Sequence, residues 1–383
     1  MRRRSIWGLI CVSLVLLTGC QTGARELQDL SLVAGIGVDQ HPNMPELVDV
    51  TAQVVKIGQI NPGPGGQGEG DGTAFWNVVS TGVTLFDAMR GSTHMTHNKL
   101  YSAHTQVLVF GRDLAKEGLA NDLDFFLRDN EIRINIPVAM ADTTAAEVLG
   151  VSSQMNRVPA ANLKVVLEDQ SLLSEGREVV LLDLAKGLLS ETSAQVLPVL
   201  RVVQNNGIPV VAAEGMAVLR KGRLVGELNS MEARGVSWVI GNVDSGSLNI
   251  PFQGRVMSYE IKGATTKLVP QLIDGVPHMK VSVFAECVLV SQNGGQDVSS
   301  EMMPVLEKQI EDRIAQEVDA ALQKAWQLGA DVFDFGETIH KTRLMDWPST
   351  IQHWDTIFPQ IVVDLSVKGE IHGEGGLVAP VQR

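Results

Sequence analysis

The sequence predicts an α+β protein of more than one domain, with mixed or antiparallel sheets, packed helices and a long helix in the C-terminal domain. Strand-like runs recur along the chain, helical patterns separate them, and one apolar stripe at i, i+4 spacing extends from Met303 to Leu328. A chain of about 360 residues after loss of an N-terminal signal is long enough for two or three hydrophobic cores.

The N-terminus has the layout of a secretory signal. Arg2, Arg3 and Arg4 precede an apolar run at residues 6–17, which is too short to span about 30 Å of hydrocarbon. Two small residues then stand before Cys20, whose thiol is placed to accept a diacylglyceryl group. We predict a signal peptide at residues 1–19 and lipidation at Cys20.

Charge and cysteine content limit how the mature chain attaches to a membrane. Residues 1–19 hold three of the 31 Lys and Arg and none of the 44 Asp and Glu, which leaves 28 cations, 44 carboxylates and a net charge of −16. Such a surface repels nucleic acid and anionic lipid, so we expect no nucleic-acid partner and attachment by acyl chains. Only Cys20 and Cys287 remain, so no disulfide within the mature chain is expected once Cys20 is acylated.

The first half alternates strands and helices. Residues 32–38 and 47–57 predict an edge hairpin, and residues 62–72 (PGPGGQGEGDG) predict a surface loop. The loop contains GxGxxG at Gly63, Gly65 and Gly68, but it lacks the strand and helix that a dinucleotide site needs. A helix at 114–127 should bury Leu119, Leu123, Phe126 and Leu127. The other expected elements are helices at 83–89, 145–149 and 179–189, and strands at 105–110, 135–141 and 196–203.

The turn Asn205-Asn206-Gly207 predicts the main domain boundary. It separates an N-terminal α/β region at 20–203 from a C-terminal α+β region at 204–383, and further subdivision of either half, for example near 253, stays open. The second half predicts strands at 208–219, 224–228, 255–262, 279–290 and 361–368. Its long helix carries the core stripe, Gly329 ends it, and Asp331 can cap the next helix.

The sequence lacks the common local motifs of an exported enzyme. The chain contains neither a nucleophile elbow nor HExxH, which argues against a cell-wall hydrolase. His94, His97 and His104 stand close in sequence without an acidic residue or thiol among them, so ordinary exposed or core histidines explain them better than a metal site. We therefore predict no catalytic, cofactor-binding or metal-binding residue.

A series of short segments runs through the mature chain in a distinctive order. These segments are Arg25-Glu26-Leu27, Gly35-Ile36-Gly37-Val38-Asp39, Leu85-Phe86-Asp87-Ala88, Leu100-Tyr101 to His104, Phe126-Leu127-Arg128-Asp129 with Glu131 and Arg133, Glu214 to Val218, Leu224-Val225-Gly226, Glu232-Ala233-Arg234-Gly235, Asp331-Val332-Phe333 with Gly336, Trp347, Trp354-Asp355 and Phe358-Pro359. In order and spacing they resemble the Ger(x)C family, the C subunit of germinant receptors. Residues 21–24 replace a Trp-Asp pair common in that family, and the loop at 62–72 looks inserted.

The resemblance implies a non-catalytic spore germination lipoprotein of a nutrient receptor, with membrane subunits A and B as partners. It places the protein at the outer face of the inner spore membrane, and it implies three domains where our boundary supports two. The alternative from another class is a solute-binding lipoprotein that feeds a transporter.

Some shared residues have structural explanations. Gly215, Gly226, Gly235 and Gly336 are expected at strand ends or turns that need positive φ or close backbone approach. The aromatic side chains near the last strand are expected to form a hydrophobic clasp. These are Trp347, Trp354 and Phe358.

Overall fold

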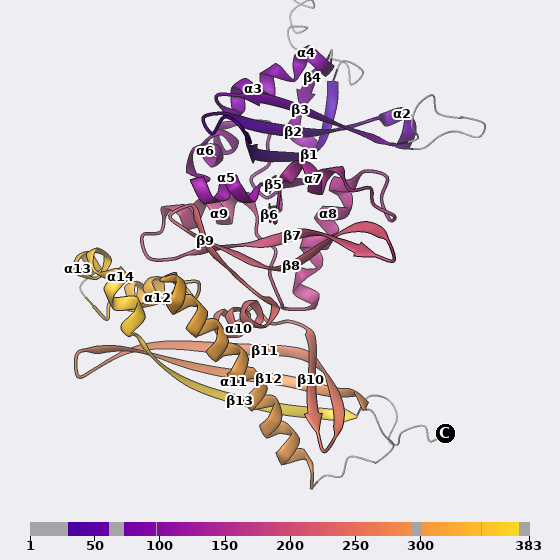
Figure 1. Cartoon of the computed structure of the whole chain (residues 1–383). Helices are drawn as coiled ribbons and strands as arrows, with labels where there is room; N and C mark the ends of the chain where they lie inside the picture. Colours follow the sequence, from indigo (N-terminus) through magenta and orange to yellow (C-terminus); the bar gives the residue numbers. More distant parts are fainter. Residues whose placement is uncertain (1–29, 61–72, 97, 293–300, 346, 375–383) are drawn as a thin grey trace, which may run out of the picture.

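Two β-sheets organise the chain in the computed structural model, and helices pack on both of them (Figure 1). The structure describes residues 30–60, 73–96, 98–292, 301–345 and 347–374. The predicted α+β class with mixed sheets, packed helices and a long C-terminal helix is confirmed. Three sequence predictions lie outside these residues: the signal peptide with Cys20, the glycine-rich loop at 62–72, and His97.

The first sheet has nine strands in the order β3-β2-β1-β5-β6-β7-β8-β9, and β4 pairs with β1. Strands β1, β5, β6 and β7 run parallel to one another, and the pairs on either side of them, β3-β2, β2-β1, β7-β8 and β8-β9, are antiparallel. The strands are β1 (Leu30–Gln40), β2 (Val48–Val55), β3 (Phe75–Gly82), β4 (Lys99–Tyr101), β5 (Val107–Phe110), β6 (Val138–Ala141), β7 (Gln195–Asn205), β8 (Ile208–Arg220) and β9 (Arg223–Leu228).

Helices cover both faces of the parallel strands, as fully buried strands require. Alternate residues of β5 show this: Val107 and Val109 pack with α7 and α8, whereas Leu108 and Phe110 pack with the core under α3, α5, α6 and α9. The helices are α2 (Ile57–Ile60), α3 (Leu85–Gly91), α4 (Thr93–Thr96), α5 (Arg112–Glu117), α6 (Ala120–Arg128), α7 (Ala145–Gly150), α8 (Pro159–Glu168) and α9 (Leu181–Leu189).

The single helix predicted at 114–127 is wrong, because α5 and α6 are separate helices. Gly118 has a φ of 122°, which a right-handed helix cannot contain. Leu119, Leu123 and Phe126 are buried as predicted. Leu127 is 44% exposed, because α6 starts as a new helix after Gly118 and turns a different set of residues to the core than one continuous helix would.

Four charged side chains close a ring at the carboxyl ends of the parallel strands. Arg112 pairs with Asp142 at 2.5 Å and with Glu227 at 2.5 Å. Arg201 pairs with the same two carboxylates at 2.6 and 2.7 Å. The ring therefore links the segments after β5 and β6 to β7 and β9.

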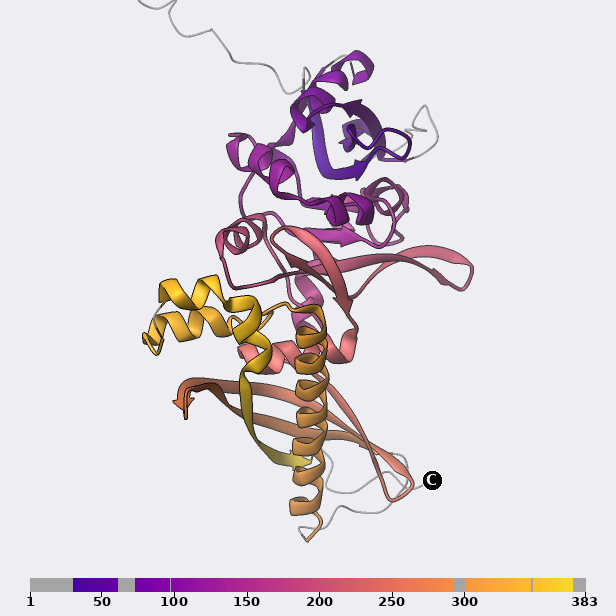
Figure 2. The same ribbon diagram turned by 60° about the vertical axis from the view of Figure 1, so that its left-hand side comes forward.

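The second sheet has four strands, β10 (Gly246–Phe252), β11 (Arg255–Ile273), β12 (Val276–Gln292) and β13 (Val362–Glu374), in that order. Helix α11 (Met303–Leu328) runs along it, as Figure 2 shows from the side, and spans the predicted residues. Leu306, Ile310, Ile314 and Val318 are buried as the stripe predicts. Gly329 ends the helix in the left-handed region with φ 59°.

Helix α10 (Ser230–Ile240) lies between the two sheets (Figure 1) and follows a capping box made by Asn229 and Glu232. It packs against α11 so closely that a Cβ at Gly235 would clash with the backbone oxygen of Glu317. The four glycines were expected at strand ends or turns. Instead, Gly235 lies inside α10, Gly336 lies inside the helix at Phe335–Thr342, and Gly215 and Gly226 lie within β8 and β9. The predicted close backbone approach is confirmed at Gly235 and at Gly215, where φ is 75° and a Cβ would clash with the backbone oxygen of Leu228. At Gly226 and Gly336 a Cβ would instead meet the side chains of Leu328 and Thr192.

A buried ion pair joins these two helices. Glu317 is fully buried and accepts hydrogen bonds from Arg234 Nε at 2.8 Å and Nη2 at 2.5 Å, from Trp238 Nε1 at 2.9 Å and from Arg313 Nε at 2.9 Å. Burial opposes the charge of Arg234, but the hydrogen bond and charge of Glu317 outweigh it and raise the pKa of Arg234.

The C-terminal helices α12 (Phe335–Thr342), α13 (Trp347–Gln352) and α14 (Trp354–Ile357) return to the first sheet. Trp354 packs on Phe358 with ring centroids 5.9 Å apart and donates from Nε1 to the oxygen of Thr192 at 3.1 Å. The predicted clasp is therefore confirmed for this pair, and the Trp347 side chain lies outside the described part. Asp331 accepts from the backbone N–H groups of Phe335 and Gly336, which confirms its predicted cap.

The turn at Asn205–Gly207, where we predict the main boundary, joins β7 to β8 within one sheet. The chain leaves the first sheet after Leu228 and enters the second at Gly246. The division into 20–203 and 204–383 stays a prediction. In the described residues, no helix has both the length and the apolar composition needed to span a bilayer.

Candidate functional site

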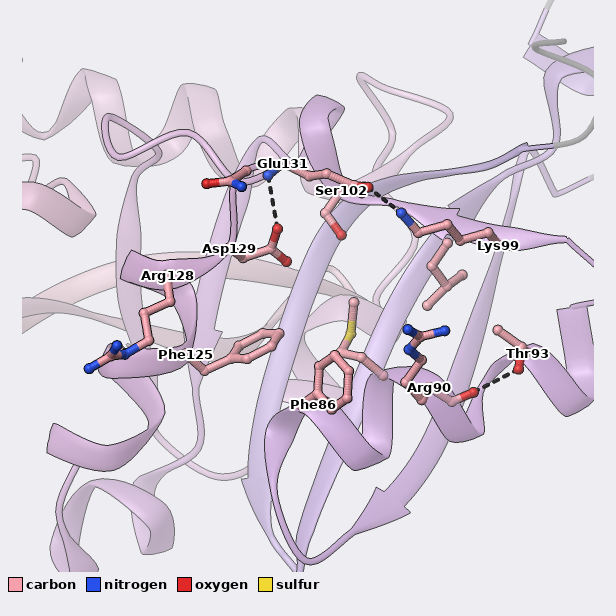
Figure 3. Close-up of a pocket in the computed structure, with 12 residues that line it drawn as sticks. Phe86, Arg90, Thr93, Lys99, Ser102, Phe125, Arg128, Asp129 and Glu131 are labelled. Atoms are coloured by element: carbon pink, nitrogen blue, oxygen red, sulfur yellow. Dashed lines mark hydrogen bonds and ion pairs between the residues drawn. The ribbon is translucent and has the colours of Figure 1, made fainter. Parts of the chain in front are cut away.

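A pocket of about 460 Å³ opens at the end of the first sheet that is farther from the second sheet. Figure 3 shows its side chains, which come from α3, α4, β4, the turn after β4, the end of α6 and the loop that follows α6. The lining residues are Phe86, Met89, Arg90, Thr93, Lys99, Leu100, Ser102, Phe125, Arg128, Asp129, Asn130 and Glu131.

The amphipathic spacing of α3 turns one of its faces to this pocket. Thr84 begins the helix by accepting a hydrogen bond from the Asp87 backbone N–H at 3.2 Å. Leu85 and Ala88 are buried in the core. The next residues on each turn, Phe86 and Met89, therefore line the pocket instead.

The pocket has an apolar lining. Leu100 is nearly buried, Met89 and Phe125 are half-buried, and Phe86 is 57% exposed. Phe125 is held by an edge-to-face contact with Phe126, with ring centroids 5.3 Å apart. Apolar side chains thus line the interior of the pocket, and the exposed ring of Phe86 lies at its mouth.

Most charged groups at the rim are already paired. Lys99 forms an ion pair with Glu131, whose other oxygen accepts from the Ser102 backbone N–H at 3.5 Å. Asp129 accepts from the Glu131 backbone N–H at 2.8 Å. These contacts hold the loop after α6 against β4.

Arg128 and Arg90 differ in their surroundings. Arg128 pairs with Asp124 one turn earlier on α6, and this hydrogen bond lowers the pKa of Asp124. The Arg90 guanidinium lies 5.2 Å from the centre of the Phe86 ring, a cation–π contact. Within the described part of the chain, no carboxylate lies within salt-bridge distance of Arg90. The site can therefore hold an apolar group and pair a negative charge beside it.

The pocket unites three of the segments on which the family resemblance rests. Phe86 comes from the segment at 85–88, and Leu100 and Ser102 come from the segment at 100–104. Asp129 and Glu131 come from the segment that begins at Phe126. Sequence reasoning named these segments without predicting that they meet. These segments do not contain the other six lining residues, Met89, Arg90, Thr93, Lys99, Phe125 and Asn130. The i, i+3, i+4 spacing of Phe86, Met89 and Arg90 was the signal that could have found two of them.

The histidines considered as metal ligands do not meet in the described structure. His94 is exposed on α4, and the ring of His104 packs edge-on against Tyr101 at 5.8 Å. In the ranges that the structure covers, no group of three or more His, Cys, Asp or Glu is arranged to hold a metal ion.

The two sheets and their packed helices define an α+β protein with a pocket at one end of its first sheet. Residues 23–202 match the family described as spore germination protein N-terminal domain, and residues 214–375 match spore germination B3/GerAC like, C-terminal. The chain belongs to the Ger(x)C family of spore germination proteins.

Curated relatives match nearly end to end. Spore germination protein KC of Bacillus subtilis (strain 168) is 25% identical over 390 residues, covering 96% of this chain and 95% of the relative. Spore germination protein B3 of the same organism is 24% identical, covering 94% and 95%. The crystal structure of the GerBC protein shares the fold with a TM-score of 0.56 at 18% identity, covering 88% of this chain and 97% of that one.

Proposed function

We propose that this chain is a non-catalytic lipoprotein subunit of a nutrient germinant receptor. It is required for spore germination and acts through contacts with membrane subunits A and B. The observation that carries the proposal is the family match over residues 23–202 and 214–375, almost the whole mature chain. The convergence of three family segments on one pocket supports a role in binding.

The proposed location is the outer face of the inner spore membrane, with lipid on Cys20. The order of cations, apolar run, small residues and cysteine supports this anchor. With a mature net charge of −16, the chain gains little from anionic lipid, so the acyl chains supply the attachment.

Replacement of the lipidated cysteine tests the anchor. Cys20→Ala should move the protein from the membrane fraction of spores to the soluble fraction and impair nutrient germination. Cys11→Ala makes the same chemical change inside the predicted signal peptide and should leave both properties unchanged. A Cys20→Ala protein that stays on membranes in spores that germinate normally would refute the anchoring role.

The size of the pocket favours one alternative, a solute-binding lipoprotein that feeds a transporter. Its volume of about 460 Å³ lies in the range of small-molecule sites, roughly 300–1,000 Å³. Calorimetry of the non-acylated mature chain with amino acids, sugars and nucleosides separates the two functions. Tight binding of one of these solutes by the isolated chain would favour the alternative.

A further inference from the structure

We propose that the pocket lined by α3, β4 and α6 is the docking site for an extracytoplasmic segment of a membrane subunit. The segment places an apolar side chain between Phe86 and Phe125 and a carboxylate against Arg90. This inference rests on the proposed function for the identity of the partner, and it adds the surface and the chemistry of contact.

The position of the pocket along the chain keeps it close to the anchor. Strand β4 pairs in parallel with the first described residues of β1, Leu30 with Lys99 and Ser31 with Leu100. Lys99 and Leu100 both line the pocket. Ten residues separate Leu30 from Cys20, so even a fully extended chain reaches only about 35 Å. A pocket beside β4 is therefore within reach of loops that leave the membrane.

Exposed apolar side chains gather on the segments around the pocket. Phe86 is 57% exposed, and Val83 (67%), Met95 (41%) and Leu127 (44%) stand on the turn before α3, on α4 and on α6. Large exposed apolar groups close together mark interaction surfaces. An aromatic ring surrounded by apolar and charged groups is the composition of an interface hot spot.

The charges at the rim select an acidic partner. Lys99 and Arg128 are each neutralised by a carboxylate of this chain, whereas Arg90 contacts the Phe86 ring and has no carboxylate within salt-bridge distance in the described residues. A carboxylate arriving beside an apolar side chain would pair with Arg90 in a partly desolvated site. Charge-assisted hydrogen bonds of this kind are stronger than neutral ones.

The shape of the pocket favours a protein segment over a free solute. Small-molecule sites bury about 70–90% of the ligand surface. Here the aromatic ring at the mouth is more than half exposed, and the Arg128 side chain at the rim is 78% exposed. A polypeptide can cover this rim, while a single small molecule leaves it in water.

Copurification of the full-length lipoprotein from spore membranes tests the site. We compare wild type with Phe86→Ala and Arg90→Glu, and measure the amount of the two polytopic subunits retained per lipoprotein. Both side chains are exposed, so the variants should fold and reach the membrane in normal amount. Matched controls on the second sheet are Ile273→Ala, at a side chain 44% exposed, and Lys280→Glu.

We expect each pocket variant to lower retention by about tenfold or more, and each control to stay within about twofold of wild type. Equal retention by wild type and both pocket variants overturns the docking site and leaves the proposed function intact. Failure of the wild type itself to retain polytopic subunits overturns the proposed function and, with it, the docking site.

A crosslinking experiment gives a second readout and leaves Phe86 and Arg90 in place. Thr93 lines the pocket from α4 and is exposed, so it can carry a photoreactive benzoylphenylalanine. We expect irradiated spore membranes to yield an adduct with a loop of a polytopic subunit that contains Asp or Glu beside an apolar residue. An adduct with lipid alone, or none with protein, overturns the proposal.

Discussion

The buried contact between α10 and α11 makes a sharp prediction about stability. Glu317 is fully buried, and its carboxylate is the principal partner of Arg234, whose side chain is only 7% exposed. Glu317→Ala would leave the guanidinium with two weaker contacts, Glu175 at 3.4 Å and the oxygen of Ser247 at 3.1 Å. It would also leave the Trp238 indole N–H without its acceptor.

The expected loss follows from these contacts. Removal of one partner of a buried ion pair costs about 3–5 kcal/mol, and an orphaned buried donor costs about 1–3 kcal/mol. The remaining contacts of Arg234 offset part of this sum, so we expect a net loss of about 4 kcal/mol. That is nearly a thousandfold change in the folding equilibrium, since 1.4 kcal/mol is about tenfold.

Urea unfolding of the non-acylated mature chain, followed by circular dichroism and Trp fluorescence, measures the loss. Asp312→Ala is the matched control, because it removes a carboxylate from the same helix whose pair with Lys308 at 2.8 Å is exposed. It should cost less than about 1 kcal/mol.

The double variant Arg234→Met with Glu317→Leu removes both charges together. It should recover the part of the loss that comes from the unpaired guanidinium, while the Trp238 indole N–H stays without its acceptor. If Glu317→Ala costs no more than Asp312→Ala, the buried pair does not hold the two helices together and the reasoning is refuted.

Three further predictions follow from the packing. Gly235→Ala should cost about 2–3 kcal/mol in thermal unfolding, because the new Cβ forces α10 from α11, whereas Gly150→Ala, with open space around it, should be nearly neutral. Burial raises the pKa of Asp331 from 3.8 to about 7. The folded chain therefore holds this proton more tightly than the unfolded chain, and the free energy of unfolding falls as pH rises between these two values. Measured from urea unfolding at about pH 5 and 8, this free energy should differ less between the two pH values for Asp331→Asn than for wild type. Asp142→Ala opens the ring of Arg112, Arg201 and Glu227 and should cost about 1 kcal/mol at low salt, a loss that shrinks when unfolding is repeated at high ionic strength.

Elements with a long, single hydrophobic period were predictable from the sequence. The stripe of α11 fixes the buried face over seven turns, and Gly329 supplies the residue that tolerates the left-handed end. The predicted strands from 32 to 38 and from 208 to 219 lie within β1 and β8 for the same reason. In these segments local pattern and tertiary environment agree.

Elements that depend on one backbone angle or on an overlooked cap were not predicted. The apolar period of residues 114–127 continues through Gly118, so only its φ of 122° reveals that α5 and α6 are separate. Helix α10 was missed although Asn229 and Glu232 form a capping box three residues apart, a signal that sequence reading can detect. Its mid-helix Gly235 reads as a turn until the close approach of α11 explains it.

The pocket could be predicted only in part, because it depends on long-range pairing. The segments around Phe86, Leu100 and Asp129 carry the family resemblance, but no local rule brings them together. Their meeting depends on the parallel pairing of β4 with β1 and on the loop that Glu131 holds against Lys99. The sequence therefore identifies the segments of the pocket but does not predict that they lie together in the folded chain.

The protein can be impaired in two separable ways, at the pocket or at the buried contact between α10 and α11. Phe86 and Arg90 are exposed, so their replacement should weaken association without lowering the free energy of unfolding. Glu317 is buried on α11, which Figure 1 shows along the second sheet and away from α3 and β4. Its replacement should therefore lower stability and reduce association only through the amount of folded protein. Association measured per folded molecule therefore distinguishes a contact surface from a structural support.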